Sequence, residues 1–205
     1  MFKTSLIISL AFFSICCNNS QHTAPHTKST STDTLVTIES DITDSIINTN
    51  DVQAIIDPVW WTGDIYQSYD IYVNSLKSFT EGQRYVYAIQ WYQSEVDNGG
   101  HDQFFYNSTG IVWQDALKGF EMIGLPKYYK ILLDAIKRFK DKPAFDRNER
   151  INQLESLKLN FDDLDDRFYS LDKSEPLQTG LMRYIDSNKK EFYYHGQINR
   201  PLNVN

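Results

Sequence analysis

Residues 95–110 read EVDNGGHDQFFYNSTG and lie between two segments whose apolar residues recur at helical spacing. Asn98, Gly99 and Gly100 predict the end of the first helix, because glycine readily adopts the left-handed conformation that closes a helix. A second helix is predicted from about 110 to 123. The stretch therefore predicts a junction between two helices, where polar side chains hydrogen-bond the backbone: Asn98, Gln103 and Asn107.

The chain on either side of this junction, from Val52 onward, also has helical patterns. Thr80 and Gln83 have the spacing of a capping box, and Asp64 is expected to cap the helix before it. Gly124 is expected to end one helix and Pro126 to begin the next. Because alternation with period two is never sustained, the sequence predicts an all-α fold, a single compact domain of about six to seven helices.

The N-terminus resembles an export signal. Residues 5–15 form an apolar run that is too short to span a bilayer, and residues 14–17 read SICC. This ending resembles the lipobox of bacterial lipoproteins, which implies removal of residues 1–16 and a palmitate-type lipid anchor on Cys17. Two alternatives stay open: Cys16 as the anchor, or an ordinary secretory signal with incidental cysteines.

The segment after the signal has a polar composition. Residues 17–50 are rich in Ser, Thr, Asn and Asp and contain no aromatic residue. Such a segment buries too little apolar surface to offset its chain entropy. We therefore expect a disordered tether over 17–50 and a folded domain over 51–205. The protein would be held to a membrane of the bacterial envelope, with its domain outside the cytoplasm.

Charge and cysteine content narrow the function classes. The net charge of −7 argues against direct binding of nucleic acid, which requires Lys and Arg to displace counterions. The only cysteines are Cys16 and Cys17, so the expected domain has no disulfide, thiol nucleophile or cysteine-based zinc site. No cofactor is expected.

The stretch 95–110 is similar to the signature of the DNA-mimic protein domain family, a small helical bacterial family. The shared pattern is an acidic residue, Asn-Gly-Gly, Gln-Phe-Phe, and Asn-Ser before the next helix. Weaker similarity extends over most of residues 60–195, and His101 departs from the pattern, which commonly has an apolar or aromatic residue there. The resemblance implies a helical fold and protein binding, in which an acidic member occupies the DNA-binding surface of a transcription regulator. It implies no catalytic residues and is compatible with a homodimer.

Two observations disfavour transferring DNA mimicry to this chain. An exported protein does not meet a cytoplasmic regulator. The charge is also segregated: residues 51–126 hold three Lys or Arg against ten Asp or Glu, whereas residues 127–158 hold nine against five. Such a distribution does not imitate the regular line of phosphates on a DNA duplex.

Three groups of residues are candidates for a site. The first is the motif itself, as a binding or structural element: Glu95, Asn98, Gly99, Gly100, His101, Gln103 and Asn107. Within it, His101 and Asp102 could form a general-base dyad, although such a dyad also requires a nucleophile or a pocket. Catalytic residues are therefore not assigned.

The second group is acidic, and Asp162, Asp165 and Asp166 are weak candidates for a Ca²⁺ site or a contact with a basic partner. The simpler interpretation is helix capping and a solvated face, because the loop pattern of calcium sites is missing. The third group would bind a small ligand or form a core stripe: Trp60, Trp61, Tyr66, Tyr69 and Tyr72.

The function expected from the sequence is a membrane-tethered, non-enzymatic protein-interaction module whose partner is unknown. The alternatives are a cell-envelope hydrolase that uses His101 and nearby acids, and a binder of small ligands through its aromatic face.

Overall fold

The computed structural model describes residues 35–202. The predicted signal peptide, the anchor Cys17 and the first half of the predicted tether lie outside these residues. The elements follow one another as β1 Leu35–Ile42, α1 Asp44–Ile47, α2 Val52–Ile55, α3 Asp57–Thr62, α4 Tyr69–Ser75, α5 Glu81–Tyr106, the 3-10 helix η1 Ser108–Val112, α6 Trp113–Ile123, α7 Pro126–Ile136, α8 Arg147–Leu157, α9 Asp162–Ser174, α10 Leu177–Ser187, α11 Lys189–Phe192 and β2 Tyr194–Pro201.

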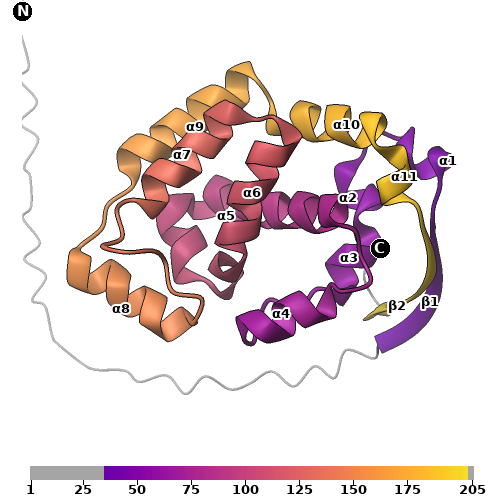
Figure 1. Cartoon of the computed structure of the whole chain (residues 1–205), viewed down its shortest axis with the longest axis horizontal. Coiled ribbons are helices and arrows are strands. Elements are labelled where there is room, and N and C mark those ends of the chain that lie inside the picture. The colour runs from indigo at the N-terminus through magenta and orange to yellow at the C-terminus, as the bar shows by residue number, and fades with distance from the viewer. Residues whose placement is uncertain (1–34, 203–205) are drawn as a thin grey trace, which may run out of the picture. The chain divides into compact units, whose positions relative to one another are not determined.

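The predicted all-α class is confirmed, with α5 at the centre of the domain (Figure 1). Helices α3, α6, α8, α9 and α11 all contact α5. Tyr92 on α5 shows why: its fully buried ring makes edge-on contacts with the rings of Phe104, Phe120 and Phe168 at centroid distances of 5.1, 5.5 and 5.7 Å. Aromatic rings from α5, α6 and α9 thus interlock in one core.

Most predicted helix boundaries are confirmed. Thr80 and Gln83 form the capping box of α5. Gly124 ends α6 in the left-handed conformation, with φ 77° and ψ 42°, and Pro126 begins α7. The prediction for Asp64 is wrong: Ser68 caps α4, and Asp64 instead accepts a hydrogen bond from Gln67 in the preceding loop. The eleven α-helices of the described residues exceed the predicted six to seven because α1, α2 and α11 are single turns of four residues each and α3 is a short helix of six.

The predicted tether is wrong over residues 35–50, where the structure has a strand and a short helix. β1 pairs antiparallel with β2 in an unbroken register from Leu35↔Pro201 to Ile42↔Tyr194. Exposed and half-buried residues alternate along β1, so period two does occur here. The partner strand is at the other end of the chain, and the weak local apolar pattern could not reveal this pairing.

The described part of the chain contains no helix that is long and apolar enough to cross a membrane.

Candidate functional site

The motif at residues 95–110 forms a kink inside α5 rather than a loop between two helices. The helix breaks at Gly99 and Gly100, then resumes at once and continues to Tyr106. Gly100 has φ 74° and ψ −174°, a combination that is essentially restricted to glycine. The predicted break is therefore confirmed, and the second half of α5 carries the remaining motif residues in a new direction.

Glu95 is the hydrogen-bond acceptor that holds the two halves of the kink together. Its buried carboxylate accepts from Gln103 Nε2 at 2.8 Å, from Asn107 Nδ2 at 2.9 Å and from Thr109 Oγ1 at 2.8 Å. Three donors spread over both oxygens compensate for the loss of water around a buried charge. The prediction that Asn98, Gln103 and Asn107 hydrogen-bond the backbone is wrong: Gln103 and Asn107 donate to the Glu95 side chain. Asn98 is exposed, and within residues 35–202 its side chain makes no hydrogen bond.

Glu95→Gln is expected to lower the free energy of unfolding by about 2 to 3 kcal/mol, because hydrogen bonds to a charged acceptor are strong and the new amide nitrogen would face donors. Chemical denaturation followed by circular dichroism measures this. The matched control is Asp97→Asn, the same change on an exposed side chain of the same helix, which should stay within about 0.5 kcal/mol of the parent. Equal losses in the two variants would contradict the assigned role of Glu95.

His101 is fully buried beside the kink, and its partner is Asp165 on α9 rather than the predicted Asp102. Both the backbone N–H of His101, at 2.9 Å, and its ring Nδ1 bond Asp165 Oδ1. Its Nε2 lies 2.8 Å from the hydroxyl of Tyr92. Both ring nitrogens thus hydrogen-bond protein groups, and the ring links α9 to the kink in α5.

Asp102 lies apart from the His101 ring interactions. Partial burial raises the pKa of Asp102, as do the nearby negative charges of Asp165 and Asp162. The side chain stays exposed and lines an open surface pocket with Tyr106 and Leu159. The structure therefore does not form the predicted His101–Asp102 dyad.

Arg150 on α8 was not singled out from the sequence, yet it is the largest fully buried side chain in the described residues. Its guanidinium donates to four carbonyl oxygens: Phe105 at 2.7 Å, Asn107 at 2.7 Å, Ala144 at 2.8 Å and Phe145 at 3.0 Å. Burial lowers the pKa of Arg150 to about 10, which leaves it charged at neutral pH. One sequence signal existed: Arg150 lies four residues before Leu154, on the same face of the helix.

Arg150 and Glu95 both hydrogen-bond the segment that follows the kink. Asn107 connects them, because its side-chain amide donates to the Glu95 carboxylate while its backbone carbonyl accepts from Arg150. The motif is therefore a buried polar network in which each charge is surrounded by hydrogen-bond partners. Such a network specifies the angle between two helix segments. Glu95 and Arg150 lie in the interior, whereas Gln103 and Asn107 are half-buried and also line the open surface pocket beside Asp102.

The candidate metal ligands point to separate partners. Asp165 bonds His101, and Asp162 accepts from Asn160 Nδ2 at 2.8 Å. Asp163 forms a two-pronged ion pair with Arg138 at 2.6 and 2.7 Å, which lowers the pKa of Asp163. Asp166 is exposed. Across residues 35–202, no three His, Cys, Asp or Glu side chains converge in a way that could hold a metal ion.

The aromatic group is mostly part of the core. Tyr72 is fully buried and donates to Asp115 at 2.8 Å, while Trp60 stacks on Trp91 at 4.2 Å. Tyr66 differs: it is 72% exposed, so its predicted inward position is wrong. The remaining members are half-buried, with Tyr69 stacked on a neighbouring ring and Trp61 donating to a carboxylate.

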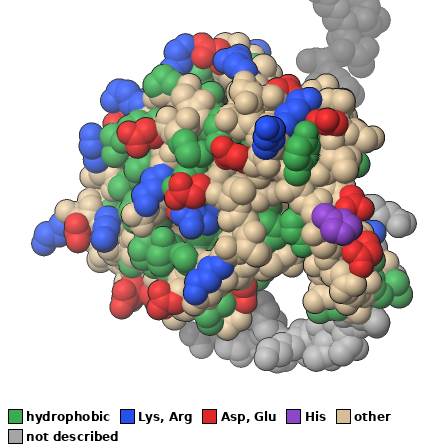
Figure 2. Space-filling view, turned by 45° about the vertical axis from the view of Figure 1, so that its right-hand side comes forward, with side chains coloured by type: hydrophobic (Ala, Val, Ile, Leu, Met, Phe, Trp, Pro, Cys, Tyr) green, Lys and Arg blue, Asp and Glu red, His purple; other side chains and the backbone are tan. Residues whose placement is uncertain are grey.

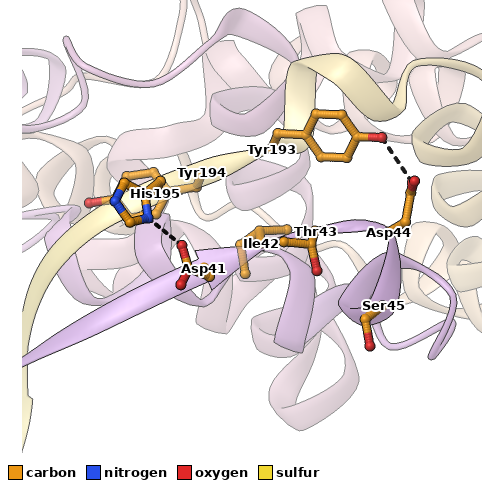
Figure 3. Close-up of a pocket in the computed structure, with 8 residues that line it drawn as sticks. All are labelled: Asp41, Ile42, Thr43, Asp44, Ser45, Tyr193, Tyr194 and His195. Carbon is orange, nitrogen blue, oxygen red and sulfur yellow. Dashed lines mark hydrogen bonds and ion pairs between the residues drawn. The ribbon is translucent and has the colours of Figure 1, made fainter.

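A pocket of about 550 Å³ lies where the two strands meet α1 (Figure 3). Two carboxylates line it, and each has a partner from the C-terminal end of the chain. Asp41 bonds the ring of His195, and Asp44 accepts from the Tyr193 hydroxyl at 2.9 Å. The sequence analysis missed this site, because its two halves are about 150 residues apart in the chain.

The His195–Asp41 pair makes a pH-dependent contribution to the strand pairing. The hydrogen bond to Asp41 and the charge of Asp41 raise the pKa of His195 above its ordinary value of 6.5, and Glu39 adds to the shift. A raised folded-state pKa means that this contribution is fully present below pH 6.5 and is lost as pH rises through the folded-state pKa.

Asp41→Asn is therefore expected to return the pKa of His195 toward its ordinary value, as measured by NMR titration of the ring protons. Glu39→Gln is the matched control and should produce a smaller shift, since Glu39 is the weaker cause. An unchanged pKa in the Asp41 variant would show that the pair does not form in solution.

Comparison with known proteins adds a family. Residues 77–188, which run from just before α5 to the end of α10, match the family described as DMP19-like protein. The matched residues include the kink, Glu95, His101, Arg150 and Asp165. Neither the curated proteins nor the solved structures gave a match. Because the match spans more than half of the chain, this protein belongs to the DMP19-like family.

Proposed function

We propose that this protein is a lipid-anchored, non-enzymatic protein-interaction module, held outside the cytoplasm by Cys17, that binds a basic protein surface. The observation that carries the proposal is the charge of residues 35–76, which contain seven acidic residues and no Lys or Arg. We call these carboxylates the acidic face: Glu39, Asp41, Asp44, Asp51, Asp57, Asp64 and Asp70.

The residues of the acidic face lie on consecutive elements of the fold. They come from β1, α1, α2, α3 and α4 and the loops between them, which lie along one side of the domain (Figure 1). Five of the seven side chains are exposed, and Asp57 and Asp64 are half-buried. A partner therefore meets several carboxylates at once, which favours fast association with a basic surface.

Within residues 35–202, few of these carboxylates have a neighbouring cation that neutralises their charge. Asp44 bonds a tyrosine hydroxyl, Asp57 accepts from Trp61 Nε1 and Asp64 accepts from Gln67 Nε2. Asp41, which pairs with His195, is the exception. In the C-terminal half, by contrast, Lys or Arg side chains pair with Asp134, Asp163 and Glu175. The unneutralised charge supports recognition of a cationic partner.

The geometry around His101 favours this proposal over an envelope hydrolase. A general base must reach a proton on its substrate, and the His101 ring is fully buried with both nitrogens bonded to Asp165 and Tyr92. Mimicry of DNA, which the family resemblance implies, would involve the matched residues 77–188, whereas the seven residues of the acidic face all precede them. Export would also keep the protein from a cytoplasmic regulator.

Photo-crosslinking in intact cells tests the proposed interaction. A crosslinking residue placed next to Asp70 on α4 should capture a partner that a residue next to the exposed Lys140, in the basic segment 127–158, does not. The triple change Asp57→Asn, Asp64→Asn and Asp70→Asn should lower the yield at least tenfold. The matched control alters charge equally elsewhere, through Asp141→Asn, Glu149→Gln and Glu155→Gln, which are exposed. Equal yields from the two triple variants would overturn the role of the acidic face.

The anchor is tested separately by fractionation. The parent protein should be found with membranes and should incorporate labelled palmitate, and Cys17→Ala should abolish both. Membrane association and label incorporation that persist in Cys17→Ala would overturn the assignment of the anchor to Cys17.

A further inference from the structure

We propose that the free edge of β1 binds an extended, basic segment of the partner as a third strand. The inference rests on the proposed function, because it names the place on the acidic face where the partner binds and the conformation that the partner adopts there.

β1 has one unpaired edge. In the part of the chain that the structure describes, β1 pairs with β2 alone, while β2 also packs on α3. Figure 1 shows β1 on the outside of this two-stranded ribbon. All eight residues of β1 have a partner in β2 in one unbroken register, so no bulge bends the strand away from an incoming chain. The outer edge therefore presents a continuous row of backbone donors and acceptors.

Apart from the two carboxylates Glu39 and Asp41, β1 lacks the features with which proteins usually protect an edge strand. Such strands are commonly short, or carry Lys, Pro or a bulge that blocks pairing with another chain. β1 is eight residues long, reads LVTIESDI and contains no Lys, Arg, Pro or Gly. β2, by contrast, contains Gly196, Arg200 and Pro201. Of the two strands, β1, which carries part of the acidic face, is therefore the one without residues that hinder pairing with another strand.

Side-chain pairs across the ribbon hold β1 in an extended conformation before any partner arrives. On its outer face, Thr37 donates to Asn199 Oδ1 at 2.7 Å, and the Gln197 amide donates to Glu39 at 2.7 Å. The Asp41–His195 pair continues the same ladder toward the pocket of Figure 3. An edge that is already ordered costs less conformational entropy to bind than a flexible segment.

The charge of β1 selects the occupant. Glu39 and Asp41 are exposed on the outer face, and Figure 2 shows acidic side chains beside the single histidine on this part of the surface. A second copy that paired edge to edge through β1 would bring these carboxylates close to their own counterparts, which is unfavourable. An incoming strand with Lys or Arg at alternate positions would instead place cations opposite them.

Hydrogen exchange with a defined peptide tests the inference. The probe is the capped peptide (Lys-Val)4, added in millimolar excess to the full-length protein in detergent micelles. Amide exchange in residues 35–42 should slow several-fold. The control is the same sequence with every backbone nitrogen methylated, which keeps the charge but has no donors, and it should not slow exchange. Glu39→Gln with Asp41→Asn should raise the Kd of the probe about three- to tenfold.

Three results would overturn strand addition: equal binding of the methylated peptide, protection confined to α3 and α4, or no binding of the probe. These results differ from a failure of the proposed function. That failure would be seen in the crosslinking experiment as equal yields from the two triple variants. The variant of Asp57, Asp64 and Asp70 does not alter β1, so the two experiments test separate claims. If the triple variant no longer crosslinked the partner, but the peptide did not protect β1 from exchange, the acidic face would keep its proposed role and strand addition would be rejected.

Discussion

Gly100→Ala is expected to lower the free energy of unfolding by about 3 to 4 kcal/mol, or to prevent folding, because two costs combine. The backbone at Gly100 has φ 74° and ψ −174°, which an alanine adopts only with strain. A Cβ atom there would also lie 2.2 Å from Asp165 Oδ2 and 2.8 Å from its Cγ. Asp165 cannot move aside without releasing the buried ring of His101.

Gly124→Ala is the matched control for this prediction. Gly124 also has a positive φ, 77°, but no atom lies within 4 Å of the position of its Cβ. The left-handed conformation alone should cost about 1 to 2 kcal/mol. Urea denaturation of the two variants separates the contribution of the Asp165 contact from that of backbone strain. If the two variants lost equal free energy of unfolding, the contact between Gly100 and Asp165 would not contribute to the effect.

Arg150→Met is expected to lower the free energy of unfolding by about 3 to 5 kcal/mol, because it removes the guanidinium donor from four carbonyl oxygens at buried or partly buried positions. Methionine fills a similar volume, so the loss reports the missing hydrogen bonds more than an empty space. Arg150→Lys should recover only part of it, since an ammonium group cannot reproduce the planar geometry of the guanidinium.

Arg147→Met serves as the control for Arg150. Arg147 begins the same helix, is exposed, and donates to a single carbonyl, that of Tyr106. Its loss should cost about 1 kcal/mol or less. Thermal unfolding by calorimetry would compare the two variants. If Arg150→Met lowered the stability no more than Arg147→Met, the buried guanidinium would not be what holds α8 to the kink.

The helical part of the fold was predictable because its signals are local. The capping box at Thr80 and Gln83, the stop at Gly124 and the start at Pro126 each depend on residues within one or two turns. The break at Gly99 and Gly100 was predictable for the same reason. The family, too, was recognisable from one stretch, since the residues of the kink follow one another in the chain.

The site was predictable only in part. Glu95, Gln103 and Asn107 were identified because they are close in sequence, although their shared hydrogen bonds became visible only in the structure. The predicted partner of His101 was wrong for a physical reason. Asp102 is its neighbour in the chain but has an exposed side chain, whereas α9 places Asp165 against the ring.

The sequence by itself determined the helical elements, the family and the acidic composition of residues 35–76, because these depend on local propensity and residue type. Only the tertiary structure decided that residues 35–42 form a strand, that Arg150 is buried and that Asp165 holds His101. Each of these depends on contacts between segments 40 or more residues apart, whose pairing follows from packing of the whole domain rather than from any local pattern.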